Sequence, residues 1–111
     1  MDMPIQQRGA VVVIRPAGPL IAAEAEAFKG RMRELMRENL GRVVIDASAL
    51  PYVDSVGLES LADVAQELAQ SGKGLKLCAA NETIRQVLEL TGLSSQFEHF
   101  EDTNSAVRSF L

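Results

Sequence analysis

The sequence predicts an α/β domain built on a mixed, mostly parallel sheet of four to five strands with about four helices. Short β-branched or apolar runs alternate with longer amphipathic segments, which is the order of strand–helix–strand crossovers. The 111 residues can bury one core, and 47% of them are hydrophobic. No repeat, low-complexity stretch or long linker divides residues 1–111, so we expect a single domain.

The chain begins with two predicted strands. "AVVVIRPAG", from Ala10 to Gly18, is rich in β-branched residues and stops at Pro16 and Gly18, which interrupt strands. The preceding "MPIQQRG" alternates weakly and ends in Arg8 and Gly9. This pattern predicts a short first strand that turns back on the second as a hairpin.

The period becomes helical from Glu24 to Leu40. Apolar residues recur there at steps of three and four, and charged residues take the opposite side. Gly41 is a natural stop for this helix. "RVVIDAS", from Arg42 to Ser48, is nearly continuous in apolar residues and predicts a strand covered on both faces. The predicted buried residues of the helix are Ala25, Phe28, Met32, Leu35 and Met36.

The second half repeats the alternation. A second amphipathic helix follows "YVDSVGLESL", "LKLCAA" predicts a strand, and Asn81 is placed to cap a third helix that ends at Gly92. "QFEHF" alternates as a last short strand, and "TNSAVRSFL" predicts a final helix with a Thr/Asn cap. The expected buried residues of the second helix are Leu58, Leu61, Ala62, Ala65, Leu68 and Ala69, and those of the third are Ile84, Val87, Leu88 and Thr91.

Charge and composition exclude several classes of function. The formal net charge is −4 and the basic residues are interleaved with glutamates, so we expect no nucleic-acid partner. No run of about 18 apolar residues exists, and the N-terminus lacks the pattern of a signal peptide, so we expect no membrane insertion. The single cysteine, Cys78, lies in an apolar run and is predicted to be buried. These features predict a cytoplasmic protein.

Catalytic motifs are largely missing. The chain has one histidine, His99, and one cysteine, so no metal site is predicted. "SGKGLK" has the residues of a turn without the spacing of a phosphate-binding loop. The sequence around Ser55 is not a G-x-S-x-G elbow, and a carboxylate pair such as Asp46 and Asp54 is uninformative by itself. We therefore expect a protein that is not an enzyme.

Asp54 and Ser55 stand where the second helix begins, and their residue types allow two interpretations. Both are preferred N-cap residues, which favours a purely structural cap. A serine at a helix start is also accessible to a kinase, and Gly57 adds no side chain beside it. A phosphate at that position would face free N–H groups and the positive end of the helix dipole. The residues alone leave both interpretations open.

A family resemblance selects the second interpretation. "VVIDASALPYVDSVGLESLADVAQEL" resembles the signature of the sulfate transporter and anti-sigma factor antagonist (STAS) domains, in which a strand ending in Asp leads to Asp-Ser-x-Gly-Leu at a helix start. "GKGLKLCAANETIRQVLELTGL" and the tail "FEHFEDTNSAV" are similar to the family's later elements. The resemblance spans nearly the whole chain and implies a STAS-like (SpoIIaa-like) fold.

The resemblance also implies a function. It makes Ser55 the phosphorylated residue of an anti-sigma factor antagonist, whose partner is an anti-sigma factor that is also an ATP-dependent serine kinase. Phosphorylation would break the complex and a serine phosphatase would restore it. ATP and magnesium belong to the kinase, so no cofactor is expected here. The residues expected to contact the partner are Asp54, Ser55, Val56, Gly57 and Leu58.

Two departures from the family pattern keep an alternative open. Val56 stands where many switch members have a polar residue, and the turn Gly18–Ile21 lacks an acid that is frequent in the antagonists. The alternative is an accessory subunit or scaffold of a transporter or signalling complex, in which Asp54 and Ser55 only cap a helix. An enzyme with Ser55 as its nucleophile is the third hypothesis, and it lacks a plausible base.

Overall fold

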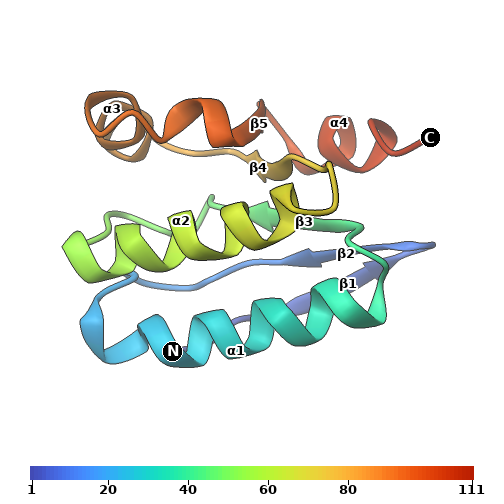
Figure 1. Ribbon diagram of the computed structural model, residues 1–111, viewed down its shortest axis with the longest axis horizontal. Coiled ribbons are helices and arrows are strands. Elements are labelled where there is room, and N and C mark those ends of the chain that lie inside the picture. The colour runs from blue at the N-terminus through green and yellow to red at the C-terminus, as the bar shows by residue number, and fades with distance from the viewer.

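A computed structural model describes all 111 residues and contains one five-stranded mixed sheet (Figure 1). The strands lie in sequence order across the sheet. The first two form an antiparallel hairpin and all later neighbours are parallel, which confirms the predicted fold class. The strands are β1 (Ile5–Arg8), β2 (Val11–Ile14), β3 (Val43–Asp46), β4 (Leu75–Cys78) and β5 (Phe97–Phe100).

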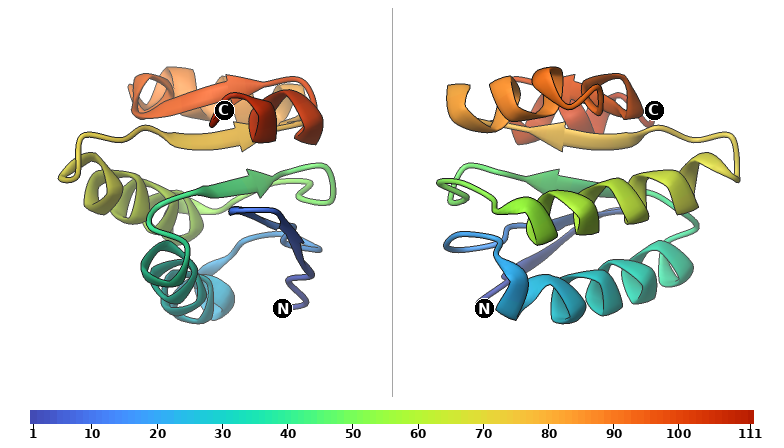
Figure 2. Two further views of the ribbon diagram at one scale, coloured as in Figure 1. Left: turned by 90° about the vertical axis from the view of Figure 1, so that its right-hand side faces the viewer. Right: turned by 60° about the vertical axis from the view of Figure 1, so that its left-hand side comes forward.

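Four helices cover the two faces of the sheet unequally. One face carries three of them and the other carries only the last, short helix (Figure 2). On the fuller face α1 and α2 pack side by side, because they form the successive crossovers from β2 to β3 and from β3 to β4, and such crossovers have the same hand. The helices are α1 (Ala22–Glu38), α2 (Ser55–Ala69), α3 (Glu82–Leu90) and α4 (Thr103–Arg108), and a 3₁₀ turn, Ser94–Gln96, precedes β5.

The alternation of side chains along the strands divides the core into two parts. Val12 and Ile14 of β2 point toward α1, α2 and α3, whereas Val11 and Val13 point toward α4. The first part is a cluster of 19 buried residues and the second has only five, including Ala106 of α4. Most of the burial free energy therefore lies on the face that α1, α2 and α3 cover.

Some predicted boundaries differ from the structure. Helix α1 begins two residues before the expected Glu24, and the strand predicted from Ala10 to Gly18 ends at Ile14. The cap of α4 is Asp102 and neither Thr103 nor Asn104, because the Asp102 carboxylate accepts the Ser105 N–H at 2.7 Å. Aspartate is one of the preferred N-cap residues, and Thr103 becomes the first helical residue.

The buried face of α2 is wider than predicted. Ser60 and Val64 are buried although both fall outside the predicted stripe, and Ala69 at the end of the helix is exposed. The extra burial arises because α2 contacts both the sheet and the side of α1. The Ser60 hydroxyl donates to the Gly57 carbonyl, 2.6 Å away, so this buried polar group has its hydrogen bond. In α3, Ile84 and Leu88 are buried as predicted, whereas Thr91 is exposed.

Candidate functional site

The loop between β3 and α2 carries the serine singled out from the sequence, and two buried residues anchor it. Ala47 and Leu50 are each 1% exposed. The side-chain amide of Asn81, the N-cap of α3, donates to the carbonyls of Leu50 and Pro51 at 3.3 and 3.1 Å. One asparagine therefore caps α3, as predicted, and also fixes the path of the loop that leads into α2.

The same loop is hydrogen-bonded to the segment that precedes α1. The Leu20 N–H donates to the Tyr52 carbonyl, and the Asp54 N–H donates to the Leu20 carbonyl, both at 3.2 Å. Leu20 and Val53 form an isolated parallel bridge between the two segments. Since Leu20 is fully buried, this pairing attaches the starts of α1 and α2 to each other and to the core.

Asp54 caps two helices at once. One carboxylate oxygen accepts the Gly57 N–H of α2 at 2.7 Å, and the other accepts the Ala22 N–H of α1 at 2.9 Å. The N-cap residue of α1, Ile21, has no side-chain acceptor of its own. The hydrogen bonds from Gly57 and Ala22 hold the pKa of the Asp54 carboxyl below its ordinary value of 3.8. Asp54 is therefore ionised at neutral pH and shared by two helix N-termini.

Ser55 is the first residue of α2 and its side chain is exposed. Asp54 caps the N-terminus of α2, so the serine hydroxyl is not needed as a cap. Two exposed apolar residues stand close to it in the chain, Val56 at 42% and Tyr52 at 50% exposure. Tyr52 was absent from the predicted partner-binding residues, although a large aromatic residue in a polar loop is a signal that could have included it.

The structure shows a packing role for Gly57 that the sequence did not predict. A Cβ atom at Gly57 would lie 1.9 Å from the carbonyl oxygen of Leu20, so no side chain fits between α2 and the segment before α1. The glycine is buried, and it permits this close approach of two backbones. Of the other predicted partner-binding residues, Asp54 and Leu58 are half-buried. Only Ser55 and Val56 of the five present exposed side chains.

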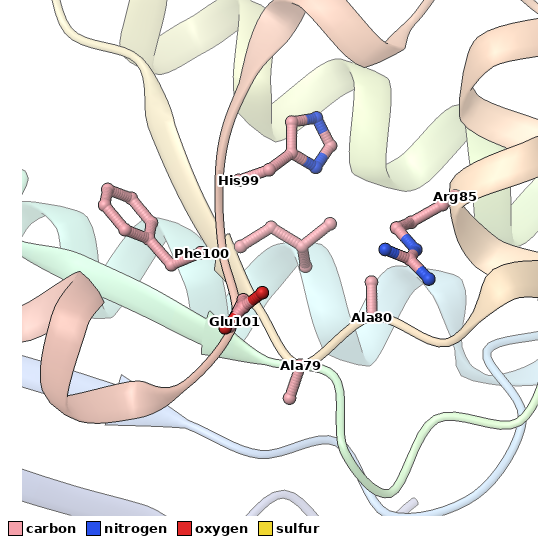
Figure 3. A pocket seen from close by; sticks show the side chains of 7 residues that line it. Ala79, Ala80, Arg85, His99, Phe100 and Glu101 are labelled. Atoms are coloured by element: carbon pink, nitrogen blue, oxygen red, sulfur yellow. The ribbon is translucent and has the colours of Figure 1, made fainter.

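The remaining titratable candidates lie away from Ser55. His99 is exposed on β5, and its Nε2 lies 2.9 Å from the Ser94 carbonyl oxygen. It lines a cavity of about 260 Å³ that is formed by β4, α3 and β5 and does not include Ser55 (Figure 3). Cys78 is buried as predicted, and burial raises the pKa of its thiol. None of these groups supplies a base next to Ser55.

Two further features bear on the expected sites. The chain contains no group of three His, Cys, Asp or Glu residues close enough to hold a metal ion. No helix has both the length and the apolar character needed to cross a membrane. Asp46 is half-buried beside the Thr103 hydroxyl, 3.5 Å away, and accepts the Ser48 N–H, so its visible role is to shape the start of the loop.

Comparison with known proteins places this geometry in a family. BtrV of Bordetella bronchiseptica is 30% identical over 93 residues, which cover 84% of this chain and 80% of BtrV. The crystal structure of TM1081 from Thermotoga maritima has a TM-score of 0.86 at 21% identity and covers 96% and 92% of the two chains. SpoIIAA of Bacillus, in its unphosphorylated form, has a TM-score of 0.74 at 16% identity and covers 98% and 96%. The STAS domain model matches residues 2–106, and the chain belongs to the STAS domain family.

Proposed function

We propose that this chain is an anti-sigma factor antagonist that is controlled at Ser55 and acts in the bacterial cytoplasm. Its partner is an anti-sigma factor with serine kinase activity, which it binds through the surface around Ser55. Phosphorylation ends binding, and a serine phosphatase restores it. BtrV, TM1081 and SpoIIAA all have names that describe anti-sigma factor antagonists, and SpoIIAA has been solved in a phosphorylated form, which supports the proposal.

The observation that carries the proposal is an exposed serine at the start of a helix whose cap is supplied by another residue. Because Asp54 already caps the N-terminus of α2, Ser55 can be modified without removing a structural hydrogen bond. A phosphate there carries roughly −1.5 to −2 charges at neutral pH and lies at the positive end of the helix dipole. The modified domain is therefore expected to stay folded while the charge of this surface changes.

The neighbouring side chains explain why such a charge would end binding. Tyr52 and Val56 offer an apolar contact surface on either side of Ser55 in the chain. A partner that covers these residues must also exclude water from Ser55, which costs little for a hydroxyl. A phosphate beside the ionised Asp54 would have to be desolvated next to a second anion, which is strongly unfavourable.

The test compares the affinity of the partner for three forms of the protein. The partner is first identified by pull-down from native lysate, with mass spectrometry of the captured proteins and of Ser55. Purified partner is then titrated with the wild type, Ser55→Ala and Ser55→Asp. We expect Ser55→Asp to weaken binding at least tenfold and Ser55→Ala to bind like the wild type and to stay bound in the presence of ATP.

Ser71→Asp is the matched control, because it adds the same charge just after the opposite end of α2, where the serine is also exposed. It should bind the partner with the affinity of the wild type. Circular dichroism should show that all forms are folded at the temperature of the titration. Equal affinity of the three Ser55 forms would contradict the proposed switch.

A further inference from the structure

The end of the sheet opposite Ser55 gathers positive charge around the turn Ser71–Gly74. There a cavity of about 330 Å³ is lined by three cationic side chains and a single carboxylate, although the chain as a whole has a net charge of −4. The turn follows α2 and the Ser55 loop precedes it, so the two lie at opposite ends of the helix (Figure 2). The charged residues of the cavity are Arg42, Lys73, Lys76 and Glu98, and its other lining residues are Gly72, Gly74 and Phe110.

The single carboxylate neutralises only one of the three cations. Lys76 is 7% exposed, and its ammonium lies 3.2 Å from the Glu98 carboxylate and 4.6 Å from the centroid of the Phe110 ring. Lys73 donates to the Leu40 carbonyl at 2.7 Å, and this acceptor carries no charge. Arg42 is half-buried and takes part in none of the molecule's ion pairs. Arg42 and Lys73 therefore form no ion pair.

The backbone of the turn adds neutral donors. The N–H groups of Ser71 and Gly72 donate to carbonyls of the last turn of α2, whereas those of Lys73 and Gly74 donate to no protein acceptor. Gly72 has a φ of +78°, which favours glycine, and a Cβ atom at Gly74 would lie 2.8 Å from Glu98 Oε2. Successive free amides in a tight turn beside cationic side chains form a common arrangement for binding anions.

We propose that this cavity binds the phosphate group of a small phosphorylated molecule. Arg42, Lys73 and the amides of the turn hold the phosphate oxygens, and the Phe110 ring forms an apolar wall for the organic part of the ligand. A guanidinium suits a tetrahedral oxyanion because its N–H groups donate in parallel. The cavity volume lies at the lower end of the range for small-molecule sites. The site does not involve Ser55, so a result that contradicts the proposed switch leaves this proposal unaffected.

The test is a titration of the ¹⁵N-labelled protein with inorganic phosphate and with pyrophosphate, followed by NMR at constant ionic strength maintained with sodium chloride. We expect saturable shifts of the Arg42, Lys73 and Gly74 amides. Arg42→Gln should weaken binding at least tenfold. Arg85→Gln is the matched control, since it removes the same charge from an exposed arginine of α3 at the other end of the sheet.

The two probes distinguish the sources of the phosphate group. Equal affinity for the two probes indicates that the ligand of this cavity is a phosphate monoester. Tighter binding of pyrophosphate indicates that the ligand is a diphosphate. Shifts that rise linearly without saturation, or that sodium chloride alone reproduces, would overturn the proposal. Equal weakening by Arg42→Gln and Arg85→Gln would do the same, because it would reduce the effect to the net charge of the protein.

Discussion

Asp54 connects two helix N-termini, since its carboxylate accepts N–H groups from Gly57 and, across 32 residues of sequence, from Ala22. These bonds lower the pKa of the carboxyl in the folded state. Their stabilisation of the fold is therefore fully present at a pH above the ordinary pKa of 3.8, and it is lost as the pH falls through the lower pKa of the folded state. In Asp54→Asn one acceptor becomes a donor. We therefore predict that the wild type has a higher urea midpoint than Asp54→Asn at pH 7 and that the difference shrinks steadily below about pH 4.

Asp102→Asn is the control for that pH series, because Asp102 caps α4 through Ser105 and its pKa is lowered in the same way. The loss of stability caused by Asp102→Asn should appear over the same pH range. It should affect α4 and leave the rest of the domain unchanged. A difference between the wild type and Asp54→Asn that stays constant from pH 7 to pH 3 would contradict the assigned role of the ionised carboxylate.

Gly57 and Gly30 allow one substitution to be tested in two opposite environments. At Gly57 an added Cβ would lie 1.9 Å from the Leu20 carbonyl oxygen, so Gly57→Ala must separate α2 from the segment before α1. At Gly30, within α1, a Cβ would meet nothing within 4 Å. We predict that Gly57→Ala lowers the free energy of unfolding by about 2 kcal/mol or more, as overpacking does. Gly30→Ala should raise it by about 0.5–1 kcal/mol, because alanine favours the helix.

Chemical denaturation of both variants measures the two effects. The opposite signs are the essential result, since a general intolerance of alanine would lower both values. A stable Gly57→Ala protein with unchanged amide shifts around Leu20 would show that the two segments are less tightly joined than the structure indicates.

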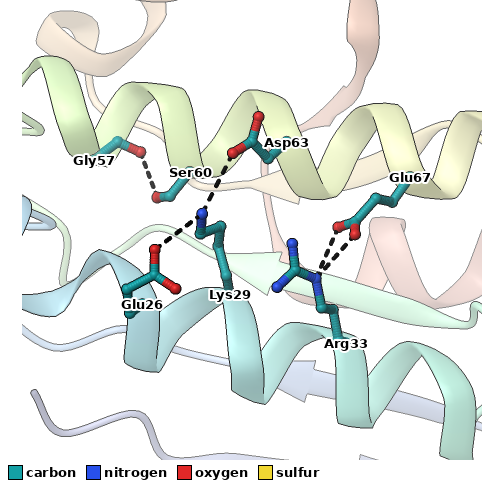
Figure 4. A network of polar contacts seen from close by, with 7 residues as sticks. All are labelled: Glu26, Lys29, Arg33, Gly57, Ser60, Asp63 and Glu67. Atoms are coloured by element: carbon teal, nitrogen blue, oxygen red, sulfur yellow. Dashed lines mark hydrogen bonds and ion pairs between the residues drawn. The ribbon is translucent and has the colours of Figure 1, made fainter.

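At the scale of elements, α1 and α2 are joined by a row of ion pairs along their outer edge (Figure 4). Lys29 lies between Glu26 and Asp63, and Arg33 pairs with Glu67 at 2.9 Å. Both partners of the second pair are about 40% exposed or more, so water and salt screen their attraction. A double-mutant cycle with Arg33→Gln and Glu67→Gln should give a coupling of only about 0.5 kcal/mol.

The same cycle repeated at high salt should give a coupling near zero. Phe28→Ala provides the contrast, because this fully buried residue of α1 contributes to the core beneath the ion pairs. It should cost about 3–5 kcal/mol at either salt concentration. A coupling that persists at high salt would show that the ion pairs, and not the apolar contact below them, set the spacing of the two helices.

Features that depend on neighbouring residues in the chain were predictable, whereas features that depend on distant ones were not. Asn81 as a cap and Gly92 as a stop follow from positions within a few residues of a helix end, and the structure has both. The bond from Asp54 to Ala22 joins two helices, and hydrophobic periodicity within each helix contains no information about it. The close contact that requires Gly57 arises in the same way.

At the scale of the whole molecule, the alternation of strands and helices was enough to predict the parallel sheet, because short crossovers between parallel strands leave few other topologies. The distribution of helices over its two faces was not predictable in the same way. A strand such as β3 is buried on both faces, so its apolar run does not say which helix covers which side. The charges around the turn Ser71–Gly74 likewise gather only in the folded chain, from residues 42, 73, 76 and 98.

The unequal faces of the sheet predict unequal local stability. Helix α4 has six residues and contributes Ala106 to a cluster of only five buried residues, whereas the opposite face has a cluster of 19. Local opening of α4 therefore exposes little apolar surface and leaves the larger cluster intact. We predict that native-state hydrogen exchange gives the amides of Ala106 in α4 and of Ser109, its C-cap, opening free energies at least about 2 kcal/mol below those of Val44 and Ile45 in β3. Ala106→Gly should lower the opening free energy of α4 by about a further 1 kcal/mol. The opening free energies of β3 and of the other central strands should stay the same relative to each other. Equal opening free energies for α4 and β3 would mean that the sheet and both of its covers unfold as one unit.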